Sequence, residues 1–147
     1  MTQEDKELLL KDICARLPYG VKVNWNDNIY YFNGIYSFNV CVLSVDNKDN
    51  VFTTAENDYI KSYLTVGINI IKPYLFPLSS MTEEQKEEYH YIVNYICPDD
   101  TENWAEGEFI YVNQMEQLLH FYHINHLDYR GLIPMDLAID ATGKNIY

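Results

Sequence analysis

The chain has 147 residues, 48% hydrophobic and 22% charged, a composition that fits one globular domain and excludes an intrinsically disordered chain. No run approaches the roughly 20 apolar residues that span a bilayer, so a membrane protein is not expected. The net charge of -12 disfavours direct nucleic-acid binding, because such binding draws on Lys and Arg to release counterions. The acidic start, residues 1–6, lacks the basic segment of a signal peptide, and we expect a cytoplasmic protein.

Residues 1–78 are predicted to form a β-rich lobe. Thr2 and Asp5 match a capping box, and apolar residues at helical spacing continue until Pro18, which indicates a first helix. Short aromatic and β-branched runs between turn residues then predict antiparallel strands. The expected strands are 22–25, 29–32, 35–38, 40–45, 51–54 and 66–71, while 59–64 fits a helical turn or a strand. Hairpin turns are expected at Asn26-Asp27-Asn28 and at Asn33–Gly34. We expect the helix to pack on a curled, small-barrel-like antiparallel sheet.

Residues 79–147 are predicted to form a helical, acidic lobe of the same α+β domain. The second helix begins at one of two capping boxes, Ser80 with Glu83 or Thr82 with Gln85. Its buried stripe continues until Pro98, which ends the helix.

The last helix is expected to begin late in this lobe. Residues 98–107 are polar and predict a loop, and residues 108–112 resemble a short edge strand. Asn113 can then cap a long helix, with Arg130 in its last turn and Gly131 as a left-handed cap.

The negative charge is concentrated in residues 82–108, which contain nine Asp and Glu residues and one lysine, Lys86. Such a field can steer a basic partner or mimic the charge of nucleic acid, and it can equally serve only to keep the surface solvated. The 14 tyrosines favour a contact surface, because tyrosine suits half-exposed interfaces. Trp104, within this region, fits either a packed loop anchor or an exposed contact.

Three polar residues of the last helix share one flank at i, i+4 and i+7: Glu116, His120 and His123. Carboxylate and imidazole are suitable zinc ligands, and Asp128 could approach from the following turn. The spacing is not His-Glu-x-x-His, and a solvated helix flank explains the same residues. Metal binding therefore stays an alternative here.

The end of the last helix carries a second group of candidate binding residues. His126 falls on the apolar side, where a half-buried imidazole would need a hydrogen-bond partner. Asp128 and Arg130 flank Tyr129 and could form an anion site, an acid/base pair or a structural ion pair. The candidate binding residues are His126, Asp128, Tyr129, Arg130 and Trp104.

Motifs for common enzyme chemistry are absent. The chain has no Gly-rich phosphate loop and no Gly-x-Ser-x-Gly nucleophile turn, and its three cysteines form no Cys-x-x-Cys pair. We therefore expect no cofactor and assign no catalytic residue.

Three passages resemble a known group of proteins: residues 17–23, residues 71–84 and residues 126–133. The chain is similar over nearly its whole length to uncharacterised small acidic proteins encoded by phages and mobile elements of Bacteroides-type gut bacteria. The resemblance implies a biological context and no reaction. It marks residues 126–133 as a signature segment and leaves His120 and His123 outside it.

These observations predict a non-enzymatic accessory or protein-interaction protein of a phage or mobile element, with a basic partner for its acidic surface. The alternative is a small metal-dependent or acid/base enzyme centred on residues 116–130.

Overall fold

The computed structural model describes residues 1–37, 40–45, 64–94 and 104–147, with the side chains of Ser37 and of residues 104–112 left undescribed. The strand expected at residues 51–54 and nearly all of the 59–64 segment lie outside these ranges. The described helices are α1 (Gln3–Ala15), α2 (Glu83–Asn94) and α3 (Trp104–Ile124), and the described strands are β1 (Lys22–Trp25), β2 (Asn28–Ser37), β3 (Val40–Ser44), β4 (Leu64–Gly67), β5 (Lys72–Leu75) and β6 (Ile139–Asp140). Three short 3-10 helices lie between them: η1 (Leu17–Tyr19), η2 (Ile68–Ile70) and η3 (Leu78–Ser80).

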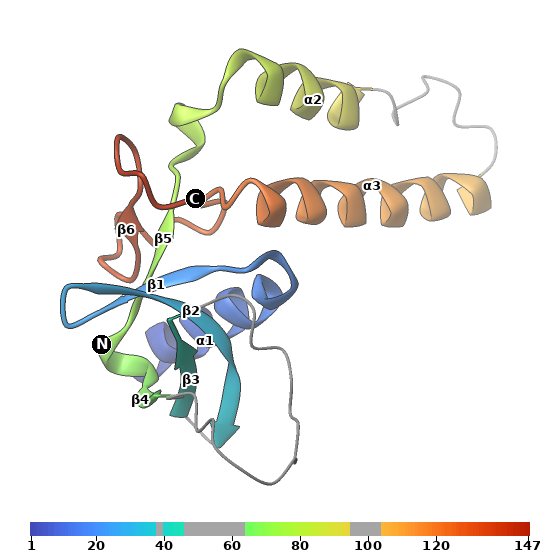
Figure 1. Cartoon of the computed structure of the whole chain (residues 1–147). Coiled ribbons are helices and arrows are strands. Elements are labelled where there is room, and N and C mark those ends of the chain that lie inside the picture. The colour runs from blue at the N-terminus through green and yellow to red at the C-terminus, as the bar shows by residue number, and fades with distance from the viewer. Residues whose placement is uncertain (38–39, 46–63, 95–103) are drawn as a thin grey trace, which may run out of the picture.

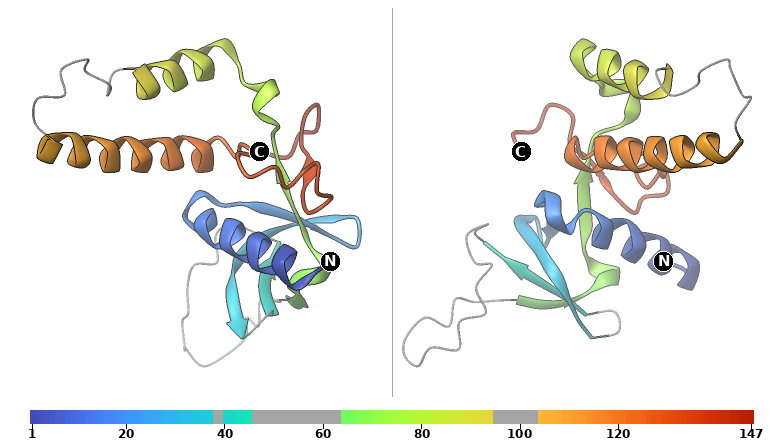
Figure 2. Two further views of the ribbon diagram at one scale, coloured as in Figure 1. Left: turned by 180° about the vertical axis from the view of Figure 1, so that it is seen from behind. Right: turned by 90° about the vertical axis from the view of Figure 1, so that its right-hand side faces the viewer.

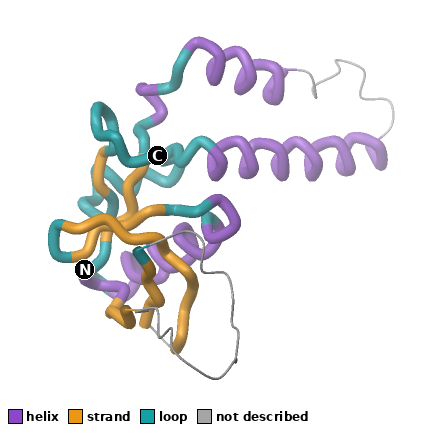
Figure 3. The backbone as a smooth tube through the Cα atoms, in the orientation of Figure 1, coloured by secondary structure: helices purple, strands orange, loops and turns teal. Residues whose placement is uncertain are grey.

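The strands form one curled sheet in the order β4-β3-β2-β1-β5-β6 (Figures 1 and 3). All described pairs are antiparallel except β5 with β6, which are parallel. The α+β class, the N-terminal helix and the curled sheet are confirmed, whereas the sheet is mixed and does not close into a barrel. A parallel pair needs a long crossover, and the chain between β5 and β6 includes both later helices.

The helix α1 covers one face of the sheet. The predicted capping box is present: the Thr2 hydroxyl accepts from the Asp5 backbone N–H, and the Asp5 carboxylate accepts from the Thr2 N–H. Its Leu9 and Ile13 are fully buried against the sheet. The main core of buried residues consists of Leu9, Ile13, Val21, Val23, Phe32, Cys41, Leu43, Val66, Ile68, Ile71, Leu75, Leu132, Leu137 and Ala138.

The first hairpin matches the prediction, but the second predicted turn is wrong. Asn26 and Asp27 have left-handed φ values of 50° and 61°, which makes the tight turn between β1 and β2. No turn occurs at Asn33–Gly34, because β2 continues to Ser37 through two irregularities in its register with β3. Gly34 has φ 141° at one of them, a conformation that favours glycine.

The helices α2 and α3 form an antiparallel hairpin, called here the arm, which extends away from the sheet (Figures 1 and 2). Of the two capping boxes considered for α2, Thr82 with Gln85 is present: each side chain accepts a backbone N–H from the other residue. Gln114 of α3 holds the far end of α2, since its amide donates to the carbonyls of Ile92 and Val93 at 3.1 and 2.9 Å.

The start of α3 contradicts the sequence prediction. The helix begins at Trp104 and includes residues 108–112, so the predicted edge strand there and the helix start at Asn113 are wrong. Its end is also earlier than expected, at Ile124, which leaves Arg130 outside the helix.

The six-stranded sheet and the helix α1 that covers it are called here the sheet lobe. The arm leaves this lobe and rejoins it at neighbouring residues. Phe76 pairs with Leu127 in a parallel bridge: the Phe76 N–H donates to the His126 carbonyl at 2.9 Å, and the Asp128 N–H donates to the Phe76 carbonyl at 2.8 Å. Residues 127–147 then pack on the sheet lobe, through β6 and the buried Leu132 and Leu137. Among the described helices none is both long and apolar enough to cross a membrane.

Candidate functional site

A partly buried cluster of charged and aromatic side chains joins α1 to the segment at the end of α3. We call Asp12, Arg16, His123, Tyr129 and Arg130 the polar junction. Asp12 and Arg16 are both fully buried, one helical turn apart, and make two hydrogen bonds of 2.7 and 3.2 Å. The Nη2 of Arg16, which makes the 3.2 Å bond to Asp12, also donates to the Leu127 carbonyl at 2.8 Å. Arg16 thereby connects residues that are 111 positions apart in the sequence.

Arg130 contacts the same carboxylate. Its Nε lies 3.2 Å from Asp12 Oδ1, an ion-pair contact without hydrogen-bond geometry. The guanidinium groups of Arg16 and Arg130 lie 5.5 and 4.8 Å from the centre of the Tyr129 ring, within the range of cation–π attraction. The Tyr129 ring also stacks on Tyr122, with centres 4.8 Å apart and planes at 9°. One carboxylate and one aromatic ring are thus shared by two cations.

Two histidines of α3 are paired with tyrosine hydroxyls. His123 is 7% exposed, and its Nε2 lies 3.0 Å from the Tyr129 hydroxyl. Burial lowers the pKa of His123, and the charge of Arg16 lowers it further, so the ring is neutral near pH 7. His120 is exposed, with its Nδ1 2.9 Å from the Tyr19 hydroxyl. The second contact connects the arm to η1.

His126 occupies an unusual backbone position directly after α3. Its φ is 51°, in the left-handed region, and the Leu127 N–H donates back to the Tyr122 carbonyl at 2.9 Å. The His126 N–H donates to the His123 carbonyl at 3.2 Å, which completes a Schellman motif. Glycine is usual at this position, and a non-glycine residue there costs about 1 kcal/mol. The cap expected at Gly131 is therefore wrong, although Gly131 does have a left-handed φ of 72°.

The His126 side chain is buried and stacked. Its ring lies 3.7 Å from the Tyr147 ring centre with planes at 12°, and Tyr147 donates its hydroxyl to the Tyr74 carbonyl at 2.8 Å. Burial, with smaller effects of Arg16 and Lys22, lowers the pKa of His126 to about 4. Its Nδ1 is buried and has no hydrogen-bond partner among the described residues. The expectation of a hydrogen-bonded imidazole does not hold for this nitrogen.

Asp128 organises the turn that follows. It is 7% exposed, and its two carboxylate oxygens accept from the backbone N–H groups of Leu132 and Ile133, both at 2.8 Å. The carboxylate thus satisfies two donors that would otherwise be unpaired. Asp128 and Arg130 do not pair with each other as the sequence suggested, because Asp128 binds backbone and Arg130 binds Asp12.

The structure does not bring the proposed metal ligands together. Glu116 is exposed on the flank of α3, while His120 and His123 each contact a different tyrosine hydroxyl. Within the described ranges, no group of three or more His, Cys, Asp or Glu side chains has a geometry suited to a metal ion. Trp104 is the first residue of α3, and its side chain lies outside the described part of the structure.

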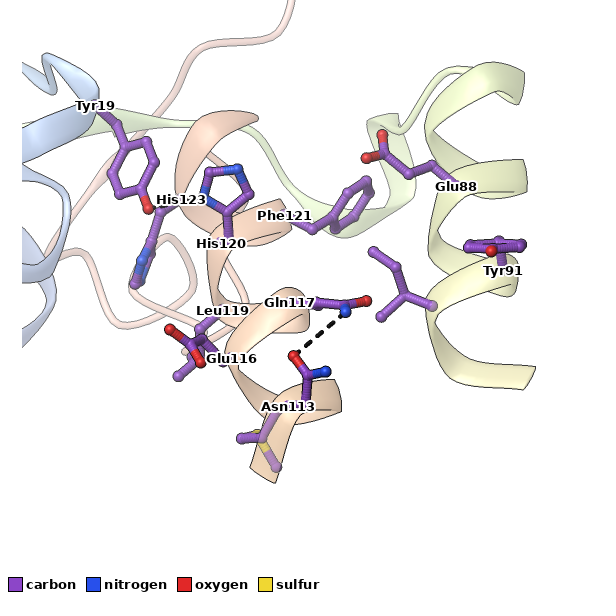
Figure 4. A pocket seen from close by; sticks show the side chains of 12 residues that line it. Tyr19, Glu88, Tyr91, Asn113, Glu116, Gln117, Leu119, His120, Phe121 and His123 are labelled. Atoms are coloured by element: carbon purple, nitrogen blue, oxygen red, sulfur yellow. Dashed lines mark hydrogen bonds between the residues drawn. The ribbon is translucent and has the colours of Figure 1, made fainter. Parts of the chain in front are cut away.

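A depression of about 1010 Å³ crosses the flank of α3 between α2 and Tyr19 (Figure 4). Figure 4 shows Phe121 pointing towards α2, and Tyr19 beside His120 and His123 on the opposite side. Phe121 and Ile92 are buried and form its floor, whereas Tyr91 and Met115 are 60% and 58% exposed. The lining residues are Tyr19, Glu88, Tyr91, Ile92, Asn113, Met115, Glu116, Gln117, Leu119, His120, Phe121 and His123.

The sequence interpretation missed Asp12, Arg16, Tyr19 and Tyr147. Asp12 and Arg16 could have been noticed, because an acid and a base at i, i+4 lie beside the apolar Leu9 and Ile13. No local signal could have identified Tyr19 or Tyr147, since their partners His120 and His126 are distant in sequence.

The junction and the depression differ chemically. The junction is packed and its charges are mutually engaged, which suits it to holding α3 in place. The depression is open and lined by apolar, amide and acidic groups, which suits it to binding. No family model matches the chain, and neither the curated proteins nor the solved structures yield a significant match.

Proposed function

We propose that the protein is a non-enzymatic interaction protein whose arm binds a basic partner protein in the cytoplasm. The observation that carries the proposal is the exposed acidic face of α2. Lys86 is the only Lys or Arg of that helix. The helix has four glutamates, all exposed: Glu83, Glu84, Glu87 and Glu88. Such a surface attracts cations and accelerates their association.

The position of the acidic face supports this function. The arm extends from the sheet lobe, so a partner can approach α2 without displacing the main core (Figure 2). The same helix exposes Tyr91, and tyrosine is enriched in protein interfaces.

The alternative function, a small acid/base or metal-dependent enzyme, receives less support. Glu116, His120 and His123 all line the depression without forming one cluster, and both imidazoles contact tyrosine hydroxyls. His126 and Asp128 do not line the depression and are engaged in the turn after α3. The candidate acid/base groups are therefore divided between two environments.

The biological context proposed here is that of an accessory protein of a phage or mobile element. It rests on the resemblance of three sequence passages. A narrower version of the proposal is that the acidic face mimics nucleic acid towards a basic host protein.

The test is affinity capture from bacterial lysate at low and high salt, followed by quantitative mass spectrometry. The bait variant changes all four glutamates of the α2 face to glutamine: Glu83→Gln, Glu84→Gln, Glu87→Gln and Glu88→Gln. We expect the wild type to enrich basic proteins at low salt and the variant to lose them, because charge attraction is screened. Equal recovery by both baits, or no protein above background, would contradict the proposal.

A further inference from the structure

We propose that the depression on the flank of α3 is a docking groove for a basic amphipathic helix of another protein. This inference rests on the proposed function and names where and how the basic partner binds. The supporting observation is an open, partly apolar depression whose lining includes two glutamates, Glu88 and Glu116, and no Lys or Arg.

The shape of the depression fits a helical segment. Its α3 lining extends from Asn113 to His123, and at 1.5 Å per residue this is about 15 Å, nearly three helical turns. One side is formed by Tyr91 and Glu88 of α2, and the other by Tyr19 (Figure 4). A third helix laid beside α3 would bury apolar surface that a two-helix hairpin leaves exposed.

The apolar groups of the depression provide the anchoring surface. Tyr91 and Met115 are exposed, and Ile92 and Phe121 form a buried floor beneath the opening. Side chains of this kind are the usual anchors of helix-in-groove complexes, where adaptable Met and rigid Tyr accept partner leucines. The amides of Asn113 and Gln117 are exposed at the edge of the depression, where they can serve polar contacts.

The acidic lining of the depression favours a basic binding partner. Glu88 and Glu116 line the depression and no Lys or Arg does, while His123 is neutral near pH 7 because burial lowers its pKa. A second copy of this chain is a poor occupant, since each copy carries a net charge of -12 and the two would repel. A helix with leucines on one face can pack on the apolar floor, and lysines beside the leucines can pair with Glu88 and Glu116.

The binding experiment uses a fluorescent 18-residue Leu/Lys peptide with leucines at helical spacing, titrated with the full chain by fluorescence anisotropy. A scrambled peptide of the same composition isolates the contribution of the amphipathic pattern. We expect the patterned peptide to bind at least about tenfold more tightly than the scrambled one, because only the patterned one presents an apolar face. Equal affinity for the two peptides overturns the groove.

Matched charge variants locate the site on the surface. Glu88→Gln with Glu116→Gln removes two charges from the lining, whereas Glu84→Gln with Glu87→Gln removes two exposed charges of α2 outside it. The first pair should weaken binding of the patterned peptide about tenfold and the second pair less than about threefold. Equal weakening means diffuse attraction, which overturns the groove and leaves the proposed function standing.

A matched apolar pair tests the anchoring surface. Met115→Ser should weaken binding about fivefold or more, and Ile70→Ser, at a similarly exposed residue of η2, should leave it unchanged. An unaffected Met115→Ser variant overturns the anchoring role. If neither peptide binds at low salt, the groove and the proposed function both fail.

Discussion

The polar junction and the arm both carry charge, but burial gives that charge opposite roles. In the junction, Asp12 and Arg16 are removed from water and bound to each other. Arg16 also donates to the Leu127 carbonyl and Asp12 contacts Arg130, and these two contacts hold α1 against the segment that follows α3. On the arm, the four glutamates of α2 face solvent. An exposed ion pair there contributes little to folding, and the combined electrostatic field of the glutamates can attract a partner. The comparison teaches that the location of charge, more than its amount, separates a structural role from a binding role.

The largest expected effect comes from removing Arg16. Arg16→Met leaves the buried Asp12 carboxylate with the ion-pair contact to Arg130, which lacks hydrogen-bond geometry, and removes the donor of the Leu127 carbonyl. Breaking a buried pair in this way costs about 3–5 kcal/mol of unfolding free energy. Urea denaturation followed by circular dichroism measures it. A loss below about 1 kcal/mol would show that the junction does not stabilise the fold.

The next effect is the pH dependence contributed by His126. The folded state lowers its pKa to about 4 from the ordinary 6.5, so the unfolded chain binds the proton more readily. The stabilisation is complete above pH 6.5 and is lost progressively as the pH falls to 4, by about 3 kcal/mol in all.

The matching variant for this prediction is His126→Asn, because asparagine tolerates the left-handed backbone and does not titrate. Unfolding free energies of both proteins, measured at several pH values between 4 and 7, give the difference due to this histidine. Parallel pH profiles of the two proteins would argue against a neutral, buried His126.

A smaller effect is expected at Asp128. Asp128→Asn keeps one acceptor and places an amide donor opposite the other backbone N–H of Leu132 or Ile133. One unsatisfied donor and the lost charge cost about 2 kcal/mol. Hydrogen exchange of the two amides should also accelerate more than that of β1 amides. Unchanged exchange at both positions would contradict the role of the carboxylate.

The smallest effect is expected on the arm. Lys86→Met removes an exposed ion pair with Glu83, in which the glutamate side chain is 85% exposed. We expect no measurable shift of the urea midpoint, since exposed pairs are solvated in both states. A shift as large as that of Arg16→Met would remove the distinction between the two regions.

The parts of the fold that depend on nearby residues were predictable. The capping boxes of Thr2 and of Thr82, the β1 strand and the Asn26–Asp27 turn all follow from side chains that act within a few positions. The run at residues 108–112 was predicted as a strand because its aromatic and β-branched residues favour strands. It is helical in the structure, since sequence context over α3 overrides that local preference.

The candidate site was less predictable for a physical reason. His126, Asp128, Tyr129 and Arg130 were identified as special, but their partners come from α1 and from Tyr147. Whether Arg130 meets Asp128 or Asp12 is decided by packing between distant segments, which periodicity does not reveal.

The bridge between Phe76 and Leu127 closes the base of the arm. The chain departs from and returns to the sheet lobe at paired residues, so residues 77–126 form a closed excursion with its ends side by side. Changes far out on such an excursion leave the hydrogen bonding of β5 intact, which is the property that makes a site tolerant of insertion.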